Sequence, residues 1–197
     1  MNLSPKFEEA LVYATRIHGG QVRKKTQVPY IGHLLGVTAI AMEYGANETE
    51  AIAALLHDAV EDCGGPERQR EIEEKFGREV GEIVAGCTDT DQTPKPPWRA
   101  RKEKYIAHLK TARASTRLVS ASDKLHNARA ILHNLREEGD AVWERFKAGK
   151  EGALWYYRAL VDAFYEHGRS ALVEELDRVV TQIEQIARNK SVSEPDR

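Results

Sequence analysis

Apolar residues recur every three or four positions along nearly the whole chain, whereas strict alternation of apolar and polar residues is scarce. The first spacing places apolar side chains on one face of a helix, and alternation would instead mark a half-buried strand. The chain is therefore predicted to be all-α. The clearest stripe belongs to a helix expected over about 170–189 and consists of Leu172, Leu176, Val179, Val180, Ile183 and Ile186.

Capping residues and glycine or proline stops divide this pattern into separate helices. Ser4 followed by Pro5 predicts the start of the first helix, and Asn47 with Glu50 forms a capping box for another. That second helix is expected to run unbroken to about Asp62, because Gly-Gly-Pro follows at 64–66. Further helices are expected over about 33–42, 66–77, 78–89, 99–111, 115–136, 141–146 and 151–166.

Nothing in the length or composition requires a second domain. The chain has 197 residues, of which 41% are hydrophobic and 30% charged, as in an ordinary globular protein. We expect one domain over 1–189, with a core of about 7–165, a C-terminal helix of about 170–189 and a disordered tail over 190–197. The stripe on the last helix can pack within the chain or form a homo-oligomer, and the sequence leaves both open.

Charge, hydropathy and cysteine content limit the expected partners and location. A net charge of −2 gives no overall attraction to nucleic acid or to an anionic membrane, so neither is an expected partner. No apolar run is long enough to span a membrane, and the N-terminus lacks the pattern of a signal peptide. Cys63 and Cys87 form no CxxC motif and no disulfide framework, which favours a reducing, cytoplasmic location.

The stretch "ALLHDAVEDC", residues 54–63, carries unusual charge at the end of an apolar helix. His57, Asp58, Glu61 and Asp62 would lie within about 140° of arc on a continuous helix. Burying charge is costly unless it is paired or bound to metal. An adjacent His-Asp pair offers one nitrogen and one oxygen to a cation, which suits Mn, Fe or Zn better than Ca.

Two distant residues are candidates to complete such a site. His33 follows the motif "PYIG", and Asp123 sits inside a largely apolar helix in "SDKLHN", with Asn127 one turn further on the same side. A lone buried aspartate is more often a hydrogen-bonded structural residue, but the three motifs together favour a site. The other histidines are interpreted as structural: His18, His108, His126, His133 and His167.

In combination these motifs resemble a known family. The order H…HD…D resembles the HD superfamily of metal-dependent phosphohydrolases. The fuller set, "HGGQVRK", "PYIGH", "ALLHDAVED", "FG", "TD" and "SDKLHN", resembles the hydrolase domain of the RelA/SpoT family, in particular its stand-alone small alarmone hydrolases. The resemblance covers about residues 7–165.

The resemblance implies an all-α, single-domain HD-type helical bundle that binds one Mn²⁺ ion. It also implies removal of pyrophosphate from the 3′ position of ppGpp or pppGpp. By position, the metal ligands would be His33, His57, Asp58 and Asp123. The resemblance further implies a catalytic acidic pair, Glu61 and Asp62, and substrate-binding residues Arg23, Lys24 and Asn127.

Elementary chemistry agrees with these roles and leaves alternatives open. A divalent metal polarises a phosphoryl oxygen and lowers the pKa of bound water, two free carboxylates can take its proton, and Arg23, Lys24 and Lys25 offer positive charge to phosphates. The same site can serve another nucleotide, such as an adenosine alarmone or NADPH. A metal-binding sensor without turnover would be expected to lack the acidic pair. Lys147, Lys150 and Tyr156 could contact phosphates or ribose, or Tyr156 could belong to an aromatic stripe that packs in the core, and the sequence leaves their role open.

Overall fold

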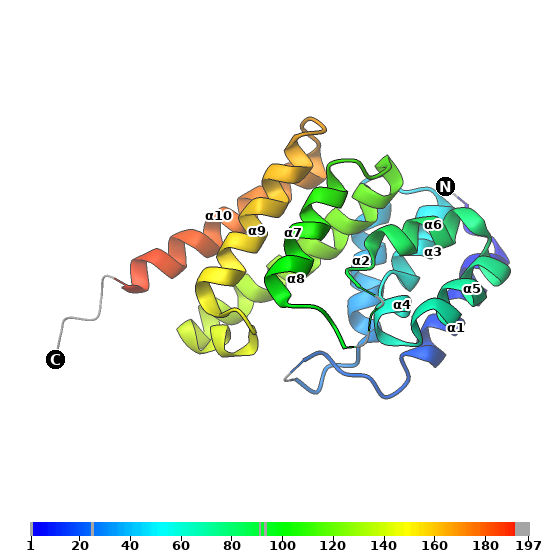
Figure 1. Ribbon diagram of the computed structural model, residues 1–197, viewed down its shortest axis with the longest axis horizontal. Coiled ribbons are helices and arrows are strands. Elements are labelled where there is room, and N and C mark those ends of the chain that lie inside the picture. Colours follow the sequence, from blue (N-terminus) through cyan, green and yellow to red (C-terminus); the bar gives the residue numbers. More distant parts are fainter. Residues whose placement is uncertain (1, 25, 91, 93, 192–197) are drawn as a thin grey trace.

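The computed structural model describes residues 2–24, 26–90, 92 and 94–191, which form a bundle of helices (Figure 1). The all-α prediction is confirmed, because the described residues pair extended backbone only in an isolated bridge between Val22 and Pro29. The elements are α1 (Pro5–Ile17), α2 (Ile31–Glu43), α3 (Glu48–Leu56), α4 (Ala59–Asp62), α5 (Gly65–Phe76), α6 (Arg78–Cys87), α7 (Trp98–Leu109), α8 (Ala114–Glu138), η1 (Gly139–Arg145), α9 (Gly149–Tyr165) and α10 (Ala171–Ser191).

The predicted helix starts are confirmed by their capping contacts. The Ser4 hydroxyl accepts a hydrogen bond from the backbone of Lys6 at the start of α1. At α3 the Asn47 side chain accepts from the Glu50 backbone, while the Glu50 carboxylate accepts from the Asn47 backbone. These reciprocal bonds satisfy backbone donors that have no partner within the helix.

The prediction of an unbroken helix to Asp62 is wrong. Helix α3 ends at Leu56, His57 and Asp58 form a turn, and the short α4 follows. The ring of His57 donates from Nδ1 to the Ala54 carbonyl at 2.8 Å. The His57 side chain thus hydrogen-bonds a backbone carbonyl near the end of α3, and this bond competes with the backbone hydrogen bonds that would continue the helix. Because of this break, the side chains of His57 and Asp58 do not have the orientation relative to Glu61 and Asp62 that a continuous helix would give them.

Most other boundaries lie within about two residues of the expected ones. The helix predicted near 141–146 is a 3-10 helix, η1, which begins at Gly139. Helix α10 continues to Ser191, two residues beyond its predicted end. The rest of the predicted tail, 192–197, lies outside the described residues.

Helix α8 joins two groups of buried apolar residues. One group belongs mainly to α1–α6 and includes Leu34, Leu56 and Val119 of α8; the other belongs mainly to α7–α10 and includes Leu125 of α8. Figure 1 shows α8 between the α9–α10 pair and the helices of the N-terminal half. Helices α2, α3 and α8 therefore meet inside the molecule, where polar residues of the three are brought together.

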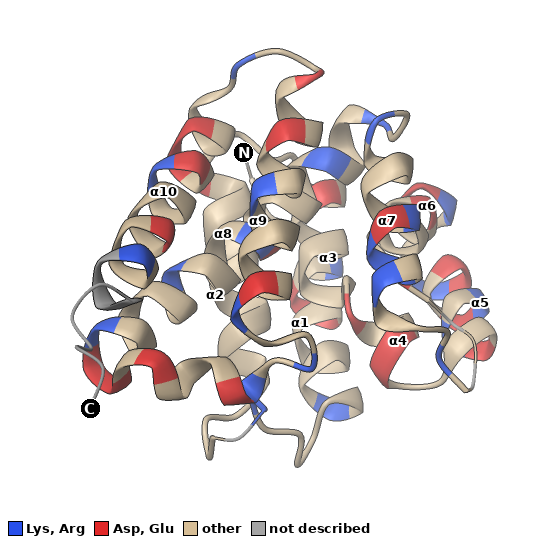
Figure 2. Ribbon diagram, turned by 60° about the vertical axis from the view of Figure 1, so that its left-hand side comes forward, with Lys and Arg blue, Asp and Glu red and all other residues tan. Residues whose placement is uncertain are grey.

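The surface carries both signs of charge, and Figure 2 shows lysine, arginine, aspartate and glutamate interspersed over the helices. Among the described residues, no helix combines the length and apolar character needed to cross a membrane. The stripe on α10 packs within the chain, since Leu172, Leu176, Val180 and Ile183 belong to the buried group of the C-terminal half.

Arg158 holds α9 against α10. Its guanidinium donates to Asp177 at 2.6 Å and to both Glu184 oxygens at 2.9 Å. We expect Arg158→Ala to lower the free energy of unfolding by about 1 kcal/mol, the scale of a half-exposed ion-pair network. That corresponds to a loss of about 2–4 °C in Tm for a chain of this size. Thermal unfolding measures it, and the exposed Arg188 of α10 offers a control, Arg188→Ala, that should leave Tm unchanged.

The sign of the pH dependence follows from Asp177. Burial raises the pKa of Asp177, but the hydrogen bonds from Arg158 and Tyr165 outweigh it and the pKa is lowered. A lowered carboxyl pKa contributes stability above its unfolded value and loses it as the pH falls. The Tm difference between wild type and Arg158→Ala should therefore be present at neutral pH and shrink below about pH 4. A difference that is constant down to pH 2 would contradict this role of Arg158.

Candidate metal centre and active site

Four predicted ligands from three parts of the chain lie close together. His33 comes from α2, His57 and Asp58 from the turn after α3, and Asp123 from the middle of α8. The His33 Nε2 atom lies 3.2 Å from Asp123 Oδ1 and 3.6 Å from Asp58 Oδ2. The His57 Nε2 atom lies 3.0 Å from Asp58 Oδ2 and 3.6 Å from Asp123 Oδ1. Two nitrogens and two oxygens thus converge.

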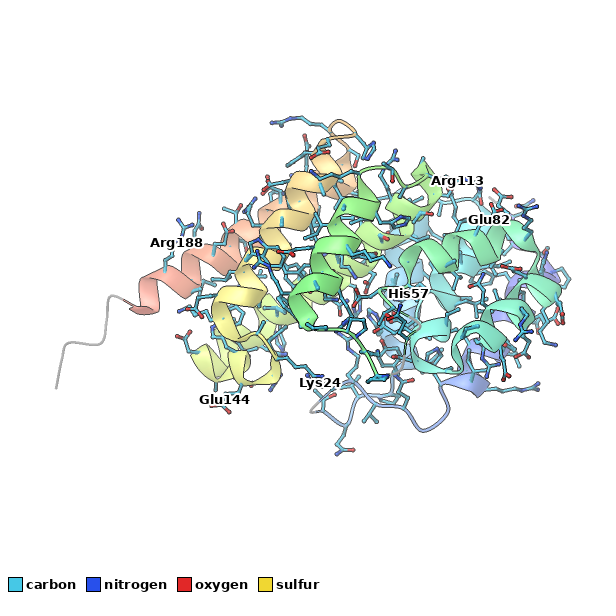
Figure 3. All side chains as sticks on the ribbon, in the orientation of Figure 1. Lys24, His57, Glu82, Arg113, Glu144 and Arg188 are labelled. Atoms are coloured by element: carbon cyan, nitrogen blue, oxygen red, sulfur yellow. The ribbon has the colours of Figure 1, made fainter. Side chains whose placement is uncertain are left out.

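This donor set fits a bound transition metal. Ligand atoms of His33, His57 and Asp58 all lie within 4.8 Å of one another, as binding to one ion requires. The buried Nε2 of His57 has no hydrogen-bond partner, although the Asp58 carboxylate is 3.0 Å away, so its alignment there is poor for a hydrogen bond. A buried polar atom without a partner is costly, and mixed imidazole and carboxylate ligation suits such metals. Figure 3 labels His57 in the interior of the bundle.

Neighbouring groups fix both carboxylates in the ionised form. Burial raises the pKa of Asp58, but His57 and His33 outweigh it and hold the pKa well below its usual range. Burial also raises the pKa of Asp123, and Lys124 together with the two histidines lowers it further than burial raises it. Lys124 Nζ lies 2.5 Å from Asp123 Oδ2. Ionised carboxylates are the form that ligates metal.

Hydrogen bonds orient the ligand side chains. The hydroxyl of Tyr30 donates to Asp58 Oδ2 at 2.6 Å, and the amide of Asn127 donates to Asp123 Oδ1. Asn127, predicted to bind substrate, therefore also contacts the predicted ligand Asp123. Tyr30 belongs to the motif "PYIGH", but the sequence does not indicate a role for it. Only the fold places its hydroxyl beside Asp58.

The two residues of the predicted catalytic pair lie beside the predicted ligands and have different hydrogen-bond partners. Asp62 Oδ2 accepts from Gln21 of the α1–α2 loop at 2.9 Å. Glu61 Oε1 accepts from Lys95 of the proline-rich loop before α7 at 2.7 Å. Burial, followed by the charge of Asp58, raises the pKa of Asp62. Neither residue is among the converging ligands, as the predicted division of roles requires.

A cavity of about 830 Å³ opens beside Asp62 and His33. Arg23 and Lys24 line it from the α1–α2 loop, and Asn127 lines it from α8. Arg23 donates to Asn127 Oδ1 at 2.7 Å, and Lys24 donates to the carbonyl of Arg145 at 2.9 Å. Figure 3 labels Lys24 on the loop at the edge of the bundle. The three predicted substrate-binding residues thus share one cavity, whereas Lys25 lies outside the described residues.

Other sequence features are not among the converging ligands. Tyr156 is buried, and Lys150 donates to the Ala187 carbonyl of α10 at 2.8 Å. Asp89 of the "TD" motif pairs with Arg101 and with Lys102 of α7, the latter at 3.0 Å, and so fastens the proline-rich loop to that helix.

Besides Tyr30, sequence reasoning missed Lys95, Lys124 and His126. His126 was interpreted as structural, yet its Nδ1 lies 2.9 Å from the Nδ1 of His33. Burial, followed by the charge of His33, lowers its pKa to about 4. Its position three residues after Asp123 places it one turn along the same side of a helix. That spacing was an available signal.

The hydrogen bond of Tyr30 offers a test of the site. Tyr30→Phe removes a donor from the predicted ligand Asp58 without changing packing, so metal affinity should fall about tenfold, as for other groups that orient ligands. Titration of the metal-free protein with Mn²⁺ measures the change. Tyr165→Phe is a matched control, because its hydroxyl donates to Asp177 at 3.1 Å between α9 and α10. Equal affinities in the two variants would contradict the role of Tyr30.

Comparison with known proteins places this fold and site in a family. The chain belongs to the HD domain family, whose sequence pattern matches residues 10–154. It is 40% identical over 126 residues to guanosine-3′,5′-bis(diphosphate) 3′-pyrophosphohydrolase MESH1 of Xenopus tropicalis, covering 62% of this chain and 68% of that protein. It is 31% identical over 138 residues to a GTP pyrophosphokinase of Myxococcus xanthus, of which it spans 18% of the length.

Two solved structures have folds similar to that of this chain. A structure described as a metazoan ortholog of SpoT that hydrolyses ppGpp superposes with a TM-score of 0.72 and 26% identity, covering 98% of this chain and 99% of that one. A protein of Listeria monocytogenes superposes with a TM-score of 0.66 and 29% identity, covering 79% of this chain and 99% of that one. The resemblance predicted from the motifs is confirmed.

Proposed function

We propose that the protein is a Mn²⁺-dependent phosphohydrolase that removes pyrophosphate from the 3′ position of ppGpp-type nucleotides. One observation carries the proposal: two histidine nitrogens and two aspartate oxygens converge beside a cavity that His33, Arg23 and Lys24 line. The relatives named for ppGpp hydrolysis support the substrate class. The presence of Glu61 and Asp62 argues against a sensor without turnover.

Each residue has a part in this hydrolysis. His33, His57, Asp58 and Asp123 would hold the metal, which when bound supplies a Lewis acid toward phosphate and a more acidic water. Asp62, with its raised pKa, and Glu61 orient a water molecule and take its proton. Water adds to phosphorus, the bond to the 3′ oxygen breaks, and that oxygen gains a proton.

The basic residues bind the anionic substrate. Arg23 presents a planar fork that suits phosphate, and Lys24 presents a point charge. In the structure both side chains have partners within the cavity, Asn127 and the Arg145 carbonyl. Substrate phosphates would replace Asn127 and the Arg145 carbonyl as acceptors for these donors, because a charged acceptor makes a stronger hydrogen bond than a neutral one.

A product assay tests the function. The protein is incubated with Mn²⁺ and ppGpp, pppGpp, ppApp or NADPH, and the products are separated by ion-exchange chromatography. Conversion of ppGpp to GDP with release of pyrophosphate is the expected result. Hydrolysis of ppApp or NADPH in its place would keep the site and change the substrate, and pyrophosphate release from none of the 3′-diphosphates would reject the proposal.

We further propose that residues 1–189 act as one catalytic unit in the cytoplasm. Helix α8 contributes buried residues to both apolar groups, which argues for one unit. Cys63 and Cys87 are both free, which suits a reducing compartment.

A further inference from the structure

His126 lies against a predicted metal ligand without being one itself. It projects from α8 three residues after Asp123, and its ring centroid is 4.8 Å from that of His33 with the planes inclined by 60°. The two Nδ1 atoms are 2.9 Å apart, which is hydrogen-bond distance. The Nδ1 atom of His126 is therefore committed to His33.

The direction of this hydrogen bond follows from the site. A neutral imidazole that gives Nε2 to a metal carries its proton on Nδ1. The Nδ1 atom of His33 must then donate, and the Nδ1 atom of His126 must accept. His57 follows the same arrangement with a different acceptor, because its Nδ1 donates to the Ala54 carbonyl at 2.8 Å. In both His33 and His57, a hydrogen bond thus fixes the Nδ1 atom, and the Nε2 atom is directed toward the other predicted ligands.

Gly36 provides the room for the His126 ring. A Cβ atom at position 36 would lie 2.3 Å from Nε2 and 2.4 Å from Cδ2 of His126. Gly36 is inside α2, one turn after His33, and is not among the glycines with a positive φ angle. Glycine inside a helix costs about 1 kcal/mol relative to alanine. Space, rather than backbone conformation, accounts for glycine here.

We propose that His126 is a positioning residue that accepts the Nδ1 proton of His33 and so aims His33 Nε2 at the metal, and that Gly36 makes this contact fit. The inference rests on the metal site proposed above and adds two residues to its support. Partners that hold a metal-ligating histidine typically change metal affinity about 10–100-fold when they are removed.

The test is Mn²⁺ affinity, measured by calorimetric titration of the metal-free protein. Folding of each variant is checked by circular dichroism. His126→Ala should weaken Mn²⁺ binding about 10–100-fold. His126→Asn should stay within about threefold of wild type, because an asparagine oxygen takes the place of Nδ1 and still accepts the proton. His133→Ala is the matched control, since His133 is an exposed histidine two turns further along α8.

Gly36→Ala tests the fit independently. It should weaken Mn²⁺ binding about tenfold on its own, because the ring must leave His33. In the His126→Ala background the same change should have no further effect, since no ring remains to be displaced. Such non-additivity is the signature of two residues that act through one contact.

The outcomes separate the possibilities. Wild-type affinity in His126→Ala, equal weakening in His126→Asn and His126→Ala, or additive effects of Gly36→Ala and His126→Ala would each overturn the role of His126. If His126→Ala does not fold, His126→Asn and Gly36→Ala still decide, because near-normal affinity in the first and weakened affinity in the second are both required. Wild-type protein that binds no Mn²⁺ would instead reject the metal site of the proposed function.

Discussion

Asp123→Ala is expected to bind no Mn²⁺ and to lose hydrolysis. Its Oδ1 lies 3.2 Å and 3.6 Å from the Nε2 atoms of His33 and His57, so the substitution removes the only ligand that α8 provides among the converging four. Metal analysis of the purified variant and the ppGpp product assay measure the two losses. Full Mn²⁺ occupancy in Asp123→Ala would overturn the ligand assignment.

The same substitution should also destabilise the protein without metal. Asp123 Oδ2 pairs with Lys124, whose side chain is only 15% exposed and lies over the ring of Tyr105. Removing one partner of a buried ion pair leaves an uncompensated charge, at a cost of roughly 3 kcal/mol. The double variant Asp123→Ala with Lys124→Met removes that charge and should recover most of the lost Tm. It should still bind no metal, which separates stability from ligation.

Glu61→Gln combined with Asp62→Asn is expected to keep the metal and lose turnover. The amides preserve size and polarity but no longer accept a proton, and loss of a general base costs about 10²–10⁴-fold in rate. Neither side chain is among the converging ligands, so Mn²⁺ affinity should remain within a few-fold. The paired measurements are kcat for ppGpp and calorimetric Mn²⁺ affinity.

A control with the same chemical change is available on α5. Glu73 and Glu74 are adjacent and exposed, and their conversion to glutamine should leave both kcat and Mn²⁺ affinity unchanged. Loss of metal from the Glu61 and Asp62 variant would show that the pair supports ligation. Normal turnover would show that the proton acceptor lies elsewhere.

Much of the fold was predictable because local signals agreed with one another. Helical periodicity and caps such as Asn47 with Glu50 are encoded within a few residues, and the structure confirms them. The break at His57 was not predictable from periodicity, because a side chain takes the Ala54 carbonyl and the backbone of His57 keeps helical angles. Hydrophobic spacing does not report such a hydrogen bond.

The candidate site likewise includes residues that the sequence predicts and residues that only tertiary packing brings in. His33, His57, Asp58 and Asp123 were found because their motifs are distinctive, and the structure brings them together. Lys95, Lys124 and His126 were missed because their partners are distant in sequence or because their residue type has a common structural explanation. His126 meets a residue 93 positions away. Only tertiary packing between α2 and α8 creates that contact.

The central position of α8 gives metal binding a consequence for the whole molecule. This helix carries Asp123 and contributes buried side chains to both apolar groups, through Val119 on one side and Leu125 on the other. In the proposed metal site, unfolding of either half would displace the predicted ligand Asp123, so metal binding would be thermodynamically linked to folding. At a free Mn²⁺ concentration 100 times its Kd, that linkage is worth about 2.7 kcal/mol. Under the proposed function, metal supply would thus set the fraction of the protein that is folded as well as its activity.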